Sequence, residues 1–292
     1  MIHFSIPGFY THNKLNTALL ELYNFDKPYV FKDNIKIDSI YDCFPGCCWM
    51  GGRLNHDPQI SPQDMKKIME EFTNRYHLSL RHVFTNSLIK NELIYDKLGN
   101  TILELSPENC GININSEELK EYIENKYPNK FYFNWSATKI LKNLKEINQY
   151  SQNNITIPSF LDVNNNFDLL KKLKYKNNIE LVVDDLCNNY CVNYYKHYIE
   201  FSKERLYDLN ANVNLCNCTQ HFNYYDRRVG KKHNITPEDI ENIYLPLGFN
   251  KFKISGREDS SIQVIESYVR YLIKPEWKDY IRNELLEFVY TY

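Results

Sequence analysis

Residues 111–127 read GININSEELKEYIENKY, and this stretch contains one complete repeat of the fold's basic unit. Residues 111–114 form a short apolar run of β type. Ser116 then stands where a helix N-cap belongs, before a segment whose apolar side chains recur at helical spacing. The stretch therefore predicts a strand that is followed at once by a helix.

The same alternation continues along the chain in both directions. Further helical segments have plausible starts at Ser61-Pro62 and at Asn165. Strict alternation of strand and helix favours a parallel sheet, and eight strands favour a closed TIM-type (β/α)8 barrel over an open doubly wound α/β sheet. The predicted strands are residues 2–6, 36–41, 80–85, 111–114, 130–134, 155–158, 179–183 and 251–255.

The rhythm breaks at residues 207–236, LYDLNANVNLCNCTQHFNYYDRRVGKKHNI. Long loops without regular structure are usually functional or disordered, and the cysteines, aromatics and arginines of this one favour function. We therefore expect a single α/β barrel domain, residues 1–292, with a cysteine-containing insertion at 207–236 between strands seven and eight.

Composition narrows the classes of protein. A formal net charge of −2 gives no global basic field, so nucleic acid would have to meet a local patch. The first residues, MIHFSIPGFYTHNK, lack the features of a signal peptide, and no window approaches the ~20 apolar residues of a membrane span. We expect a soluble cytoplasmic protein without membrane partners, whose eight cysteines are thiols, ligands or core residues rather than disulfides.

Four cysteines lie near the end of the seventh predicted strand. Cys187 and Cys191 follow it as C-x3-C, and the insertion supplies Cys216 and Cys218 as C-x-C. Loops after the strands form the active-site face of such barrels, so four thiolates could close around a [4Fe-4S] cluster or a zinc ion. Zinc sites prefer C-x2-C pairs, so these spacings favour the cluster. A radical SAM site is excluded, because Tyr194 stands where its further cysteine would be.

Cysteines can also simply fill a core, because free cysteine is among the most buried residue types. We prefer that interpretation for Cys43 and Cys110, and core or pocket lining for the adjacent Cys47 and Cys48. The polar residues that flank the other four cysteines favour ligation. His221, Cys47 or Cys48 remains an alternative ligand, since imidazole replaces thiolate in some clusters.

A glycine-rich segment, FPGCCWMGGRL, follows the second predicted strand. Gly51 and Gly52 would let a ligand approach the main chain, and Arg53 offers a planar fork for phosphate or carboxylate. Arg257, at the end of the last strand, would face the same barrel mouth, so two arginines could grip one anionic substrate. The alternative, a sharp turn with Arg53 paired to a structural acid, is equally open.

Three titratable side chains lie close to the first cysteine pair. Asp185 precedes Cys187 by two residues, while His197 and Tyr198 follow Cys191 by one to two helical turns. Each could relay protons, and we take them as the candidate catalytic residues.

The closing segment, LGFNKFKISGREDSSIQVIESYVRYLI at residues 247–273, resembles the terminal signature of the collagenase-like peptidase family. In that family a lysine-isoleucine-glutamate-glycine-arginine strand end leads into a helix that ends in a tyrosine-arginine pattern. Here the strand end is KISGR, residues 253–257, with Ser255 in place of the glutamate. The N-S-x-x-L motif at residues 115–119 and IELVVDDLCNNYC at residues 179–191 agree with the resemblance.

The resemblance implies a TIM-like barrel. Several family members carry a [4Fe-4S] cluster on four cysteines and support oxygen-independent hydroxylation of transfer RNA, ribosomal RNA or a quinone precursor, although their cluster cysteines are more widely spaced. The chain is more similar to an uncharacterised bacterial and phage group. That group has F-P-x-x-x-W-x-G-G-R near the second strand and C-x3-C followed by H-Y near the seventh.

We therefore expect an iron-sulfur cluster-dependent modifying enzyme, an oxidoreductase that hydroxylates an RNA-linked or other anionic substrate without oxygen. A zinc-stapled barrel that acts as a binding module is the first alternative. A hydrolase or peptidase is suggested by the family name alone, since neither G-x-S-x-G nor H-E-x-x-H occurs in the chain. Substrate, partner protein and oligomeric state do not follow from the sequence.

Overall fold

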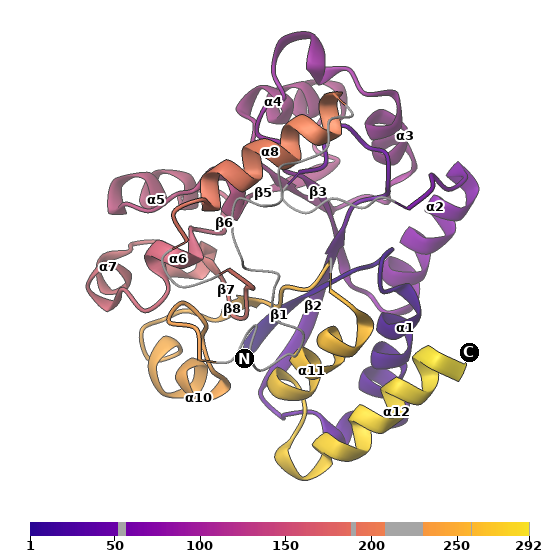
Figure 1. Ribbon diagram of the computed structural model, residues 1–292, viewed down its shortest axis with the longest axis vertical. Helices are drawn as coiled ribbons and strands as arrows, with labels where there is room; N and C mark the ends of the chain where they lie inside the picture. Colours follow the sequence, from indigo (N-terminus) through magenta and orange to yellow (C-terminus); the bar gives the residue numbers. More distant parts are fainter. Residues whose placement is uncertain (52–56, 188–190, 208–229, 258, 292) are drawn as a thin grey trace.

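The computed structural model describes residues 1–51, 57–187, 191–207, 230–257 and 259–291. Eight parallel strands form one sheet in the order β6-β5-β4-β3-β2-β1-β8-β7. An isolated parallel bridge between Thr156 and Ile179 joins the two edges, so the sheet curls into a nearly closed barrel (Figure 1). The α/β barrel expected from the sequence is confirmed.

Each predicted strand is present, and no strand end differs from its expected position by more than two residues. The strands are β1 (Ile2–Pro7), β2 (Ile35–Asp42), β3 (Ser79–Phe84), β4 (Cys110–Ile114), β5 (Phe131–Trp135), β6 (Ile155–Thr156), β7 (Glu180–Val182) and β8 (Lys251–Lys253). β7 and β8 are parallel neighbours, with Glu180 opposite Lys251 and Val182 opposite Lys253. These two strands, consecutive along the chain, thus pair in parallel as a (β/α)8 barrel requires.

Helices surround the barrel in the order of the chain (Figure 1). They are α1 (Asn13–Glu21), α2 (Pro62–Glu70), α3 (Lys97–Leu105), α4 (Glu117–Lys126), α5 (Leu144–Ser151), α6 (Phe160–Val163), α7 (Phe167–Lys172), α8 (Tyr194–Tyr207), α10 (Pro237–Asp239), α11 (Ser261–Tyr271) and α12 (Lys278–Thr291). Among the described residues no helix combines the length and apolar character that crossing a membrane requires.

Side-chain caps start the helices where the sequence places them, with one shift. The Ser116 hydroxyl accepts a hydrogen bond from the Leu119 N–H at 3.1 Å, and Ser61 caps α2 in the same way. The cap of α7 is Asn166, whose side chain accepts from the Leu169 N–H, rather than the predicted Asn165. Asn165 adopts a left-handed backbone conformation, which no helical N-cap uses.

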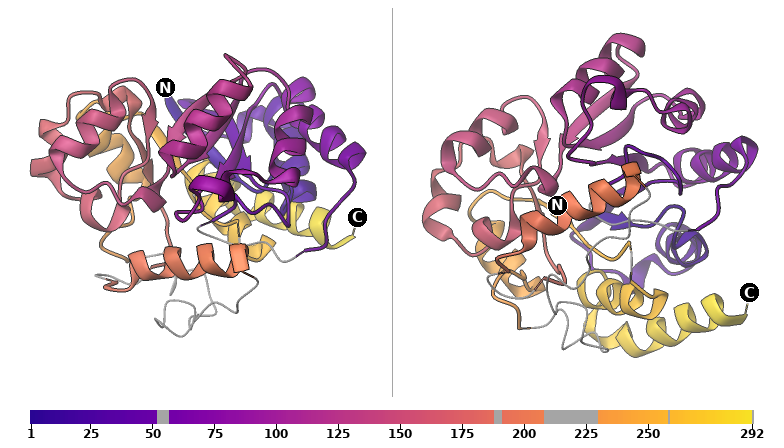
Figure 2. Two further views of the ribbon diagram at one scale, coloured as in Figure 1. Left: turned by 90° about the horizontal axis from the view of Figure 1, so that it is seen from above. Right: turned by 45° about the horizontal axis from the view of Figure 1, so that its top comes forward.

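The helix α8 departs from the regular pattern. A helix between neighbouring barrel strands ordinarily packs on the outer wall, but α8 crosses the mouth at the carboxyl ends of the strands (Figure 2). In the second half of α8 the Ser202 hydroxyl accepts a hydrogen bond from the Ser87 N–H at 3.1 Å. At its start the Tyr194 hydroxyl donates to the Ala137 carbonyl at 3.4 Å. The helix is thereby tied to the loops after β3 and β5.

The segment after β2 contributes mainly to the core. Trp49 is fully buried, and its Nε1 donates to the Ile94 carbonyl at 3.1 Å. Cys43 and Cys110 are buried as expected, Cys47 is buried beside Cys43, and Cys48 is half-buried. The buried aromatic and the thiols explain why this segment combines tryptophan with two adjacent cysteines.

One buried histidine on β3 makes stability depend on pH. The His82 Nε2 lies 2.7 Å from the Ser106 hydroxyl, its ring stacks on Phe84, and burial lowers the pKa of His82 to about 3. An unfolded histidine has a pKa near 6.5, so between these values the unfolded chain binds a proton that the folded chain does not.

We expect the free energy of unfolding to fall as the pH decreases from about 6.5 towards 3, with His82 contributing up to about 1.4 kcal/mol per pH unit. His82→Gln should reduce this slope, whereas His77→Asn on the surface should retain it. Urea unfolding at several pH values measures both. An unchanged slope in His82→Gln would contradict the assignment.

Candidate functional site

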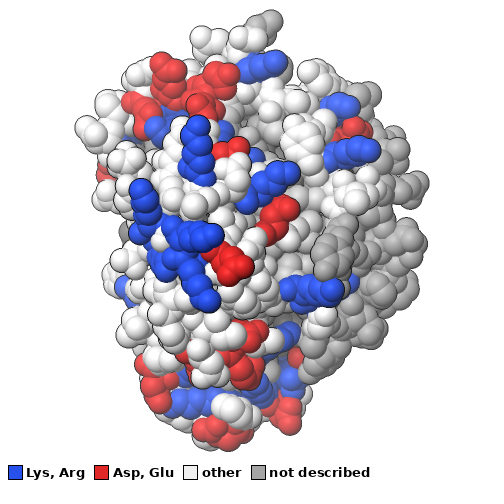
Figure 3. All heavy atoms as spheres, turned by 90° about the vertical axis from the view of Figure 1, so that its left-hand side faces the viewer, with Lys and Arg blue, Asp and Glu red and all other residues white. Residues whose placement is uncertain are grey.

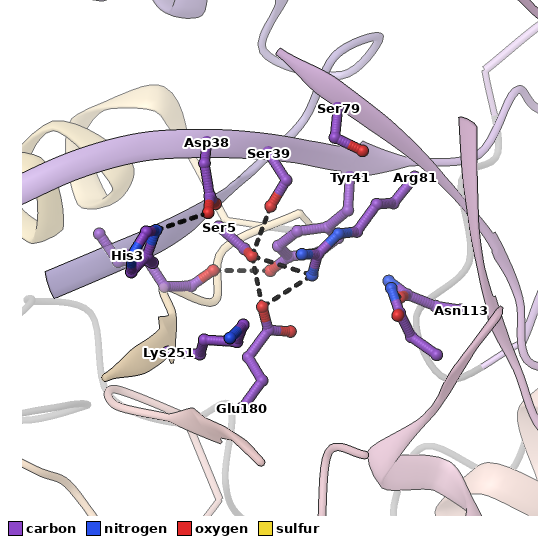
Figure 4. Close-up of polar contacts among 12 residues, drawn as sticks. His3, Ser5, Asp38, Ser39, Tyr41, Ser79, Arg81, Asn113, Glu180 and Lys251 are labelled. Carbon is purple, nitrogen blue, oxygen red and sulfur yellow. Dashed lines mark hydrogen bonds and ion pairs between the residues drawn. The ribbon is translucent and has the colours of Figure 1, made fainter. Parts of the chain in front are cut away.

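A buried ion pair lies inside the barrel. The Arg81 Nη1 of β3 lies 2.7 Å from the Glu180 Oε1 of β7, and these side chains are only 6% and 2% exposed. The Ser5 hydroxyl donates to the same carboxylate oxygen at 2.5 Å and accepts from Arg81 at 3.0 Å. Ser39 lies 2.6 Å from Ser5, so the network joins β1, β2, β3 and β7 (Figure 4).

The two charges stabilise each other in this setting. Burial alone would raise the pKa of Glu180, but the Arg81 guanidinium, the Lys253 amine and hydrogen bonds outweigh burial and lower it. Burial opposes the charge of Arg81 too, yet the Glu180 carboxylate raises the pKa of Arg81 above its ordinary value. Both groups are therefore ionised at neutral pH.

Lys253 of β8 lies two residues nearer to the barrel mouth than Lys251, the register partner of Glu180. Its Nζ is 3.6 Å from the centroid of the Tyr41 ring, and within the described part of the chain it has no ion-pair partner. Burial lowers the pKa of Lys253 to about 7; attraction to Glu180 opposes this shift, and repulsion from Arg81 and Arg257 adds to it. Lys253 is thus a basic side chain that titrates near neutral pH.

A cavity of about 110 Å³ opens at the carboxyl ends of the strands. It is lined by the loops after β2, β3, β5 and β7, by the end of β8 and by the face of α8 that carries Tyr198. Polar and apolar groups meet there, because Val83, Ile157 and Val182 also form its wall. Its ionisable and phenolic lining residues are Lys253, Arg257, Asp185, Asp259, Tyr41 and Tyr198.

Arg257 lines this cavity in a fixed position. Its Nη2 donates to the Gly51 carbonyl at 3.2 Å, and its Nε lies 3.8 Å from the Asp42 Oδ1. Asp42 is fully buried, and its carboxylate also accepts hydrogen bonds from Thr11 and from the Cys43 N–H. The structure therefore places Arg257 at the barrel mouth, where the sequence predicts it, and binding by this residue stays a prediction.

The glycine-arginine motif is described only in part. Gly51 lines the cavity, but Gly52 and Arg53 lie outside the described residues. A Cβ atom at Gly51 would lie 2.6 Å from backbone atoms of Asn86 and Thr85. Because Gly51 has no side chain, the loops after β2 and β3 can pack closely against each other. Gly51 therefore has a packing role.

Two of the three candidate catalytic residues share the cavity. Asp185 and Tyr198 line it, whereas His197, one residue earlier on α8, is not part of the lining. The Asp185 Oδ1 accepts a hydrogen bond from the Cys187 N–H at 2.9 Å, which fixes the turn between the strand and the cysteine. Proton transfer by any of the three stays a prediction.

Cys187 and Cys191 belong to the wall behind the cavity. Cys187 is buried in a small apolar cluster with Phe160, Val182 and Tyr194, and the half-buried Cys191 packs against the same cluster. Phe160 and Val182 also line the cavity, so the first cysteine pair is next to it.

A metal site would need further ligands. Within the residues that the structure describes, no three histidine, cysteine or acidic side chains gather in a way that could hold a metal ion. Cys216 and Cys218, which would complete a four-thiolate site, and the alternative ligand His221 lie outside the described residues. Cys187 and Cys191 share one apolar cluster, and ligation by them stays a prediction.

Sequence reasoning missed the ion pair and the unusual lysine. Arg81 and Glu180 lie in predicted strands beside apolar residues, and a charge in a buried strand has to be paired or face water. That signal could have located the pair, because alternate residues of barrel strands point inward. Lys253 was noticed as part of a motif, but its surroundings depend on residues far away in the sequence.

The molecular surface offers no single basic face in the view of Figure 3. Lysine and arginine side chains lie among acidic ones on the described part of this face. This distribution agrees with the small net charge of the chain and gives no support to binding of a long polyanion there.

Comparisons of the sequence with family models and with curated proteins find no match. The structure is similar to that of the U32 peptidase Mk0906, with a TM-score of 0.51 and 10% sequence identity. The similarity covers 89% of this chain and 95% of that chain. At this identity the likeness shows the fold, a barrel like that of a collagenase-like (U32) peptidase, and leaves the chemistry open.

The buried ion pair predicts a large effect of a small substitution. Glu180→Gln retains the shape of the side chain but leaves the Arg81 charge buried without its partner, so we expect the free energy of unfolding to fall by about 3–5 kcal/mol. Glu124→Gln, which removes a surface pair with Lys120 on α4, should change it by less than about 1 kcal/mol.

Urea unfolding of the two variants measures the difference. Replacing both Arg81 and Glu180 by Met should recover part of the loss, because no unpaired charge then remains. A loss below about 1 kcal/mol in Glu180→Gln would show that water reaches the pair.

Proposed function

We propose that the protein is an enzyme that binds a small carboxylate- or phosphate-bearing molecule at the mouth of its barrel. The observation that carries this proposal is the convergence of Lys253, Arg257, Asp185 and Tyr198 on one partly apolar cavity. In barrels of this architecture, ligands bind at the carboxyl ends of the strands. A pocket that combines apolar walls with a few convergent polar groups is typical of a small-molecule site.

The charge of the ligand follows from the two basic groups. Lys253 directs an amine into the cavity without a carboxylate partner among the described residues, and Arg257 adds a planar set of N–H donors to the same space. Arginine suits two-point binding of carboxylate or phosphate. An anion between these side chains would be held by both.

The size of the ligand follows from the cavity and from α8. A volume of about 110 Å³ accepts a small molecule or the end group of a larger one. The helix α8, which crosses the mouth and is tied to the loops after β3 and β5, restricts entry of a folded polymer (Figure 2). An RNA-linked substrate would therefore have to insert a single modified group.

A second proposal concerns the metal centre. We infer that Cys187 and Cys191, together with Cys216 and Cys218, hold a [4Fe-4S] cluster next to the cavity. Cys187 and Cys191 both pack in the apolar side-chain group that includes Phe160, and Phe160 also lines the cavity. This position beside the cavity supports the inference. Such a cluster would supply electron transfer, as oxygen-independent hydroxylation of an anionic substrate requires. With zinc instead, the cysteines would only hold the insertion in place.

Peptide hydrolysis is the activity named for the similar barrel, and it is a weaker candidate for this chain. No residue arrangement in the described part of the cavity favours it over small-anion binding.

The cysteine assignment predicts which thiols retain iron. Ser in place of Cys187, Cys191, Cys216 or Cys218 should release most of the iron from anaerobically purified protein, because each removes one thiolate ligand. The controls Cys43→Ser and Cys110→Ser alter buried thiols of the core, so folded protein of these variants should keep its iron.

Iron, zinc and sulfide analysis with an anaerobic absorption spectrum provides the measurement. A brown protein that contains iron and sulfide supports the [4Fe-4S] cluster. A colourless protein that contains one zinc ion supports a structural zinc site. Equal iron loss from all six variants would refute the ligand set.

The anion proposal predicts a loss of affinity without a loss of structure. Arg257→Lys keeps the charge but removes the planar fork, so affinity for inorganic phosphate or oxalate should fall by about 1–3 kcal/mol, roughly 5- to 150-fold. Titration calorimetry measures this, with the exposed Arg75→Lys as control. Equal affinity of wild type and Arg257→Lys for both anions would contradict the proposed site.

A further inference from the structure

We propose that Lys253 is a nucleophilic amine that forms an imine with a small carbonyl acid, such as an α-oxo acid, bound at the barrel mouth. This inference rests on the proposed function, because it names the class of anion that the cavity accepts. It gives Lys253 and Arg257 separate tasks, one at the carbonyl group and one at the carboxylate.

The position of the amine is set by the strand and by an aromatic ring. Lys253 is paired in register with Ser5 of β1 and Val182 of β7, which fixes its backbone between two strands. Its Nζ lies over the Tyr41 ring, and the Tyr41 hydroxyl is itself anchored by donating to the Ile254 carbonyl at 2.7 Å. The amine therefore has one defined place at the edge of the cavity.

The surroundings of the amine favour its neutral form. The Glu180 Oε1 accepts hydrogen bonds from Arg81 and Ser5, and no ion pair joins Glu180 to Lys253. The apolar side chains of Val83 and Val182 line the same cavity as Lys253 and reduce the contact of its side chain with water. A neutral amine carries the lone pair that nucleophilic attack needs.

The pKa of Lys253 agrees with this geometry. Burial lowers it to about 7, so roughly half of the molecules hold a neutral amine at pH 7. For an ordinary lysine the neutral fraction at this pH is below about one in a thousand. The cation–π contact with Tyr41 favours the charged form by only about 0.5–2 kcal/mol, which is less than the effect of burial.

The covalent step balances without an oxidant or a reductant. The Lys253 nitrogen attacks the carbonyl carbon, the carbon-oxygen double bond becomes a single bond, and a carbinolamine forms. Both N–H protons of the amine pass to the carbonyl oxygen, one as the carbinolamine forms and one as that oxygen leaves as water, and the nitrogen lone pair completes the carbon-nitrogen double bond. One carbonyl compound and one amine give one imine and one water.

The carboxylate of an α-oxo acid is bonded directly to the reacting carbonyl carbon. A group that binds this carboxylate must therefore lie in the same small space as the amine. Arg257 and Lys253 line one cavity of about 110 Å³, which meets this requirement. A simple aldehyde lacks the carboxylate and would use only the amine.

Reductive trapping on the wild-type protein tests the inference without depending on the folding of a variant. The protein is incubated with glyoxylate, or with acetaldehyde, and sodium cyanoborohydride near pH 7, and the modified lysines are mapped by mass spectrometry. Lys253 should react at least tenfold faster than the other lysines, because roughly half of its amine is neutral at this pH. Its rate should rise with pH and level off above about 7.

A matched control lies on the same strand. The Lys251 Nζ donates to the Asn177 carbonyl at 2.6 Å, and Lys251→Met should leave trapping at Lys253 unchanged. Arg257→Lys should slow trapping by glyoxylate but not by acetaldehyde, because only glyoxylate carries a carboxylate.

The outcomes separate the two proposals. Preferred trapping of Lys253 by acetaldehyde and glyoxylate at equal rates would support the amine and contradict the anion site. Trapping that shows no preference for Lys253 over surface lysines overturns the imine proposal, even where phosphate and oxalate bind. Preferred and faster trapping by glyoxylate supports both.

Discussion

The Arg81–Glu180 ion pair inside the barrel is the interaction on which the rest of the arrangement depends. Two charges in a dry interior cost several kcal/mol each unless they are paired and hydrogen-bonded, and here Ser5 contacts both of them. Arg81 belongs to β3 and Glu180 to β7, which are separated by three strands in the sheet order. The pair can form only when the sheet curls, and it supports the closure made by the Thr156–Ile179 bridge between the two edges.

The same pair determines the chemistry of the mouth above it. Attraction to the Glu180 carboxylate, whose Oε1 is shared by Arg81 and Ser5, favours the charged form of Lys253, whereas repulsion from Arg81 and Arg257 opposes it. Burial and the two arginines then prevail. The network around the Arg81–Glu180 pair thus contributes to the lowered pKa of Lys253, which lies at the mouth of the barrel beside Arg257. Stability and proposed reactivity share one set of residues.

The sequence predicts the barrel well because its signals are local. Short apolar runs specify the eight strands within two residues, caps mark the starts of α2, α4 and, within one residue, α7, and eight such strands leave few alternative architectures. The direction of α8 could not be predicted, because helical period does not say which surface a helix covers. Its place across the mouth depends on contacts such as Ser202 with Ser87, which join distant segments.

The candidate site is predicted less completely. Asp185 follows β7, Tyr198 lies on the helix α8 after the β7 loop, and Arg257 follows β8. Residues that follow barrel strands line the active-site face, so their positions in the sequence predict that they reach the cavity. For Gly51 the sequence could not distinguish two roles, because close approach of a ligand and close approach of a neighbouring loop both require a residue without a side chain. The structure shows the backbone of Asn86 and Thr85 against Gly51. The lowered pKa of Lys253 arises from burial and from repulsion by Arg81 on β3 and Arg257 after β8, so no local pattern encodes it.

The most direct measurement is the titration of the Lys253 amine by NMR of isotope-labelled lysine side chains, with the signal assigned through Lys253→Arg. A midpoint near 7 in the folded protein is expected if the buried pair leaves this amine without a partner. A midpoint near the ordinary value of 10.5 would contradict both the isolation of Lys253 and the reactive mouth that depends on it.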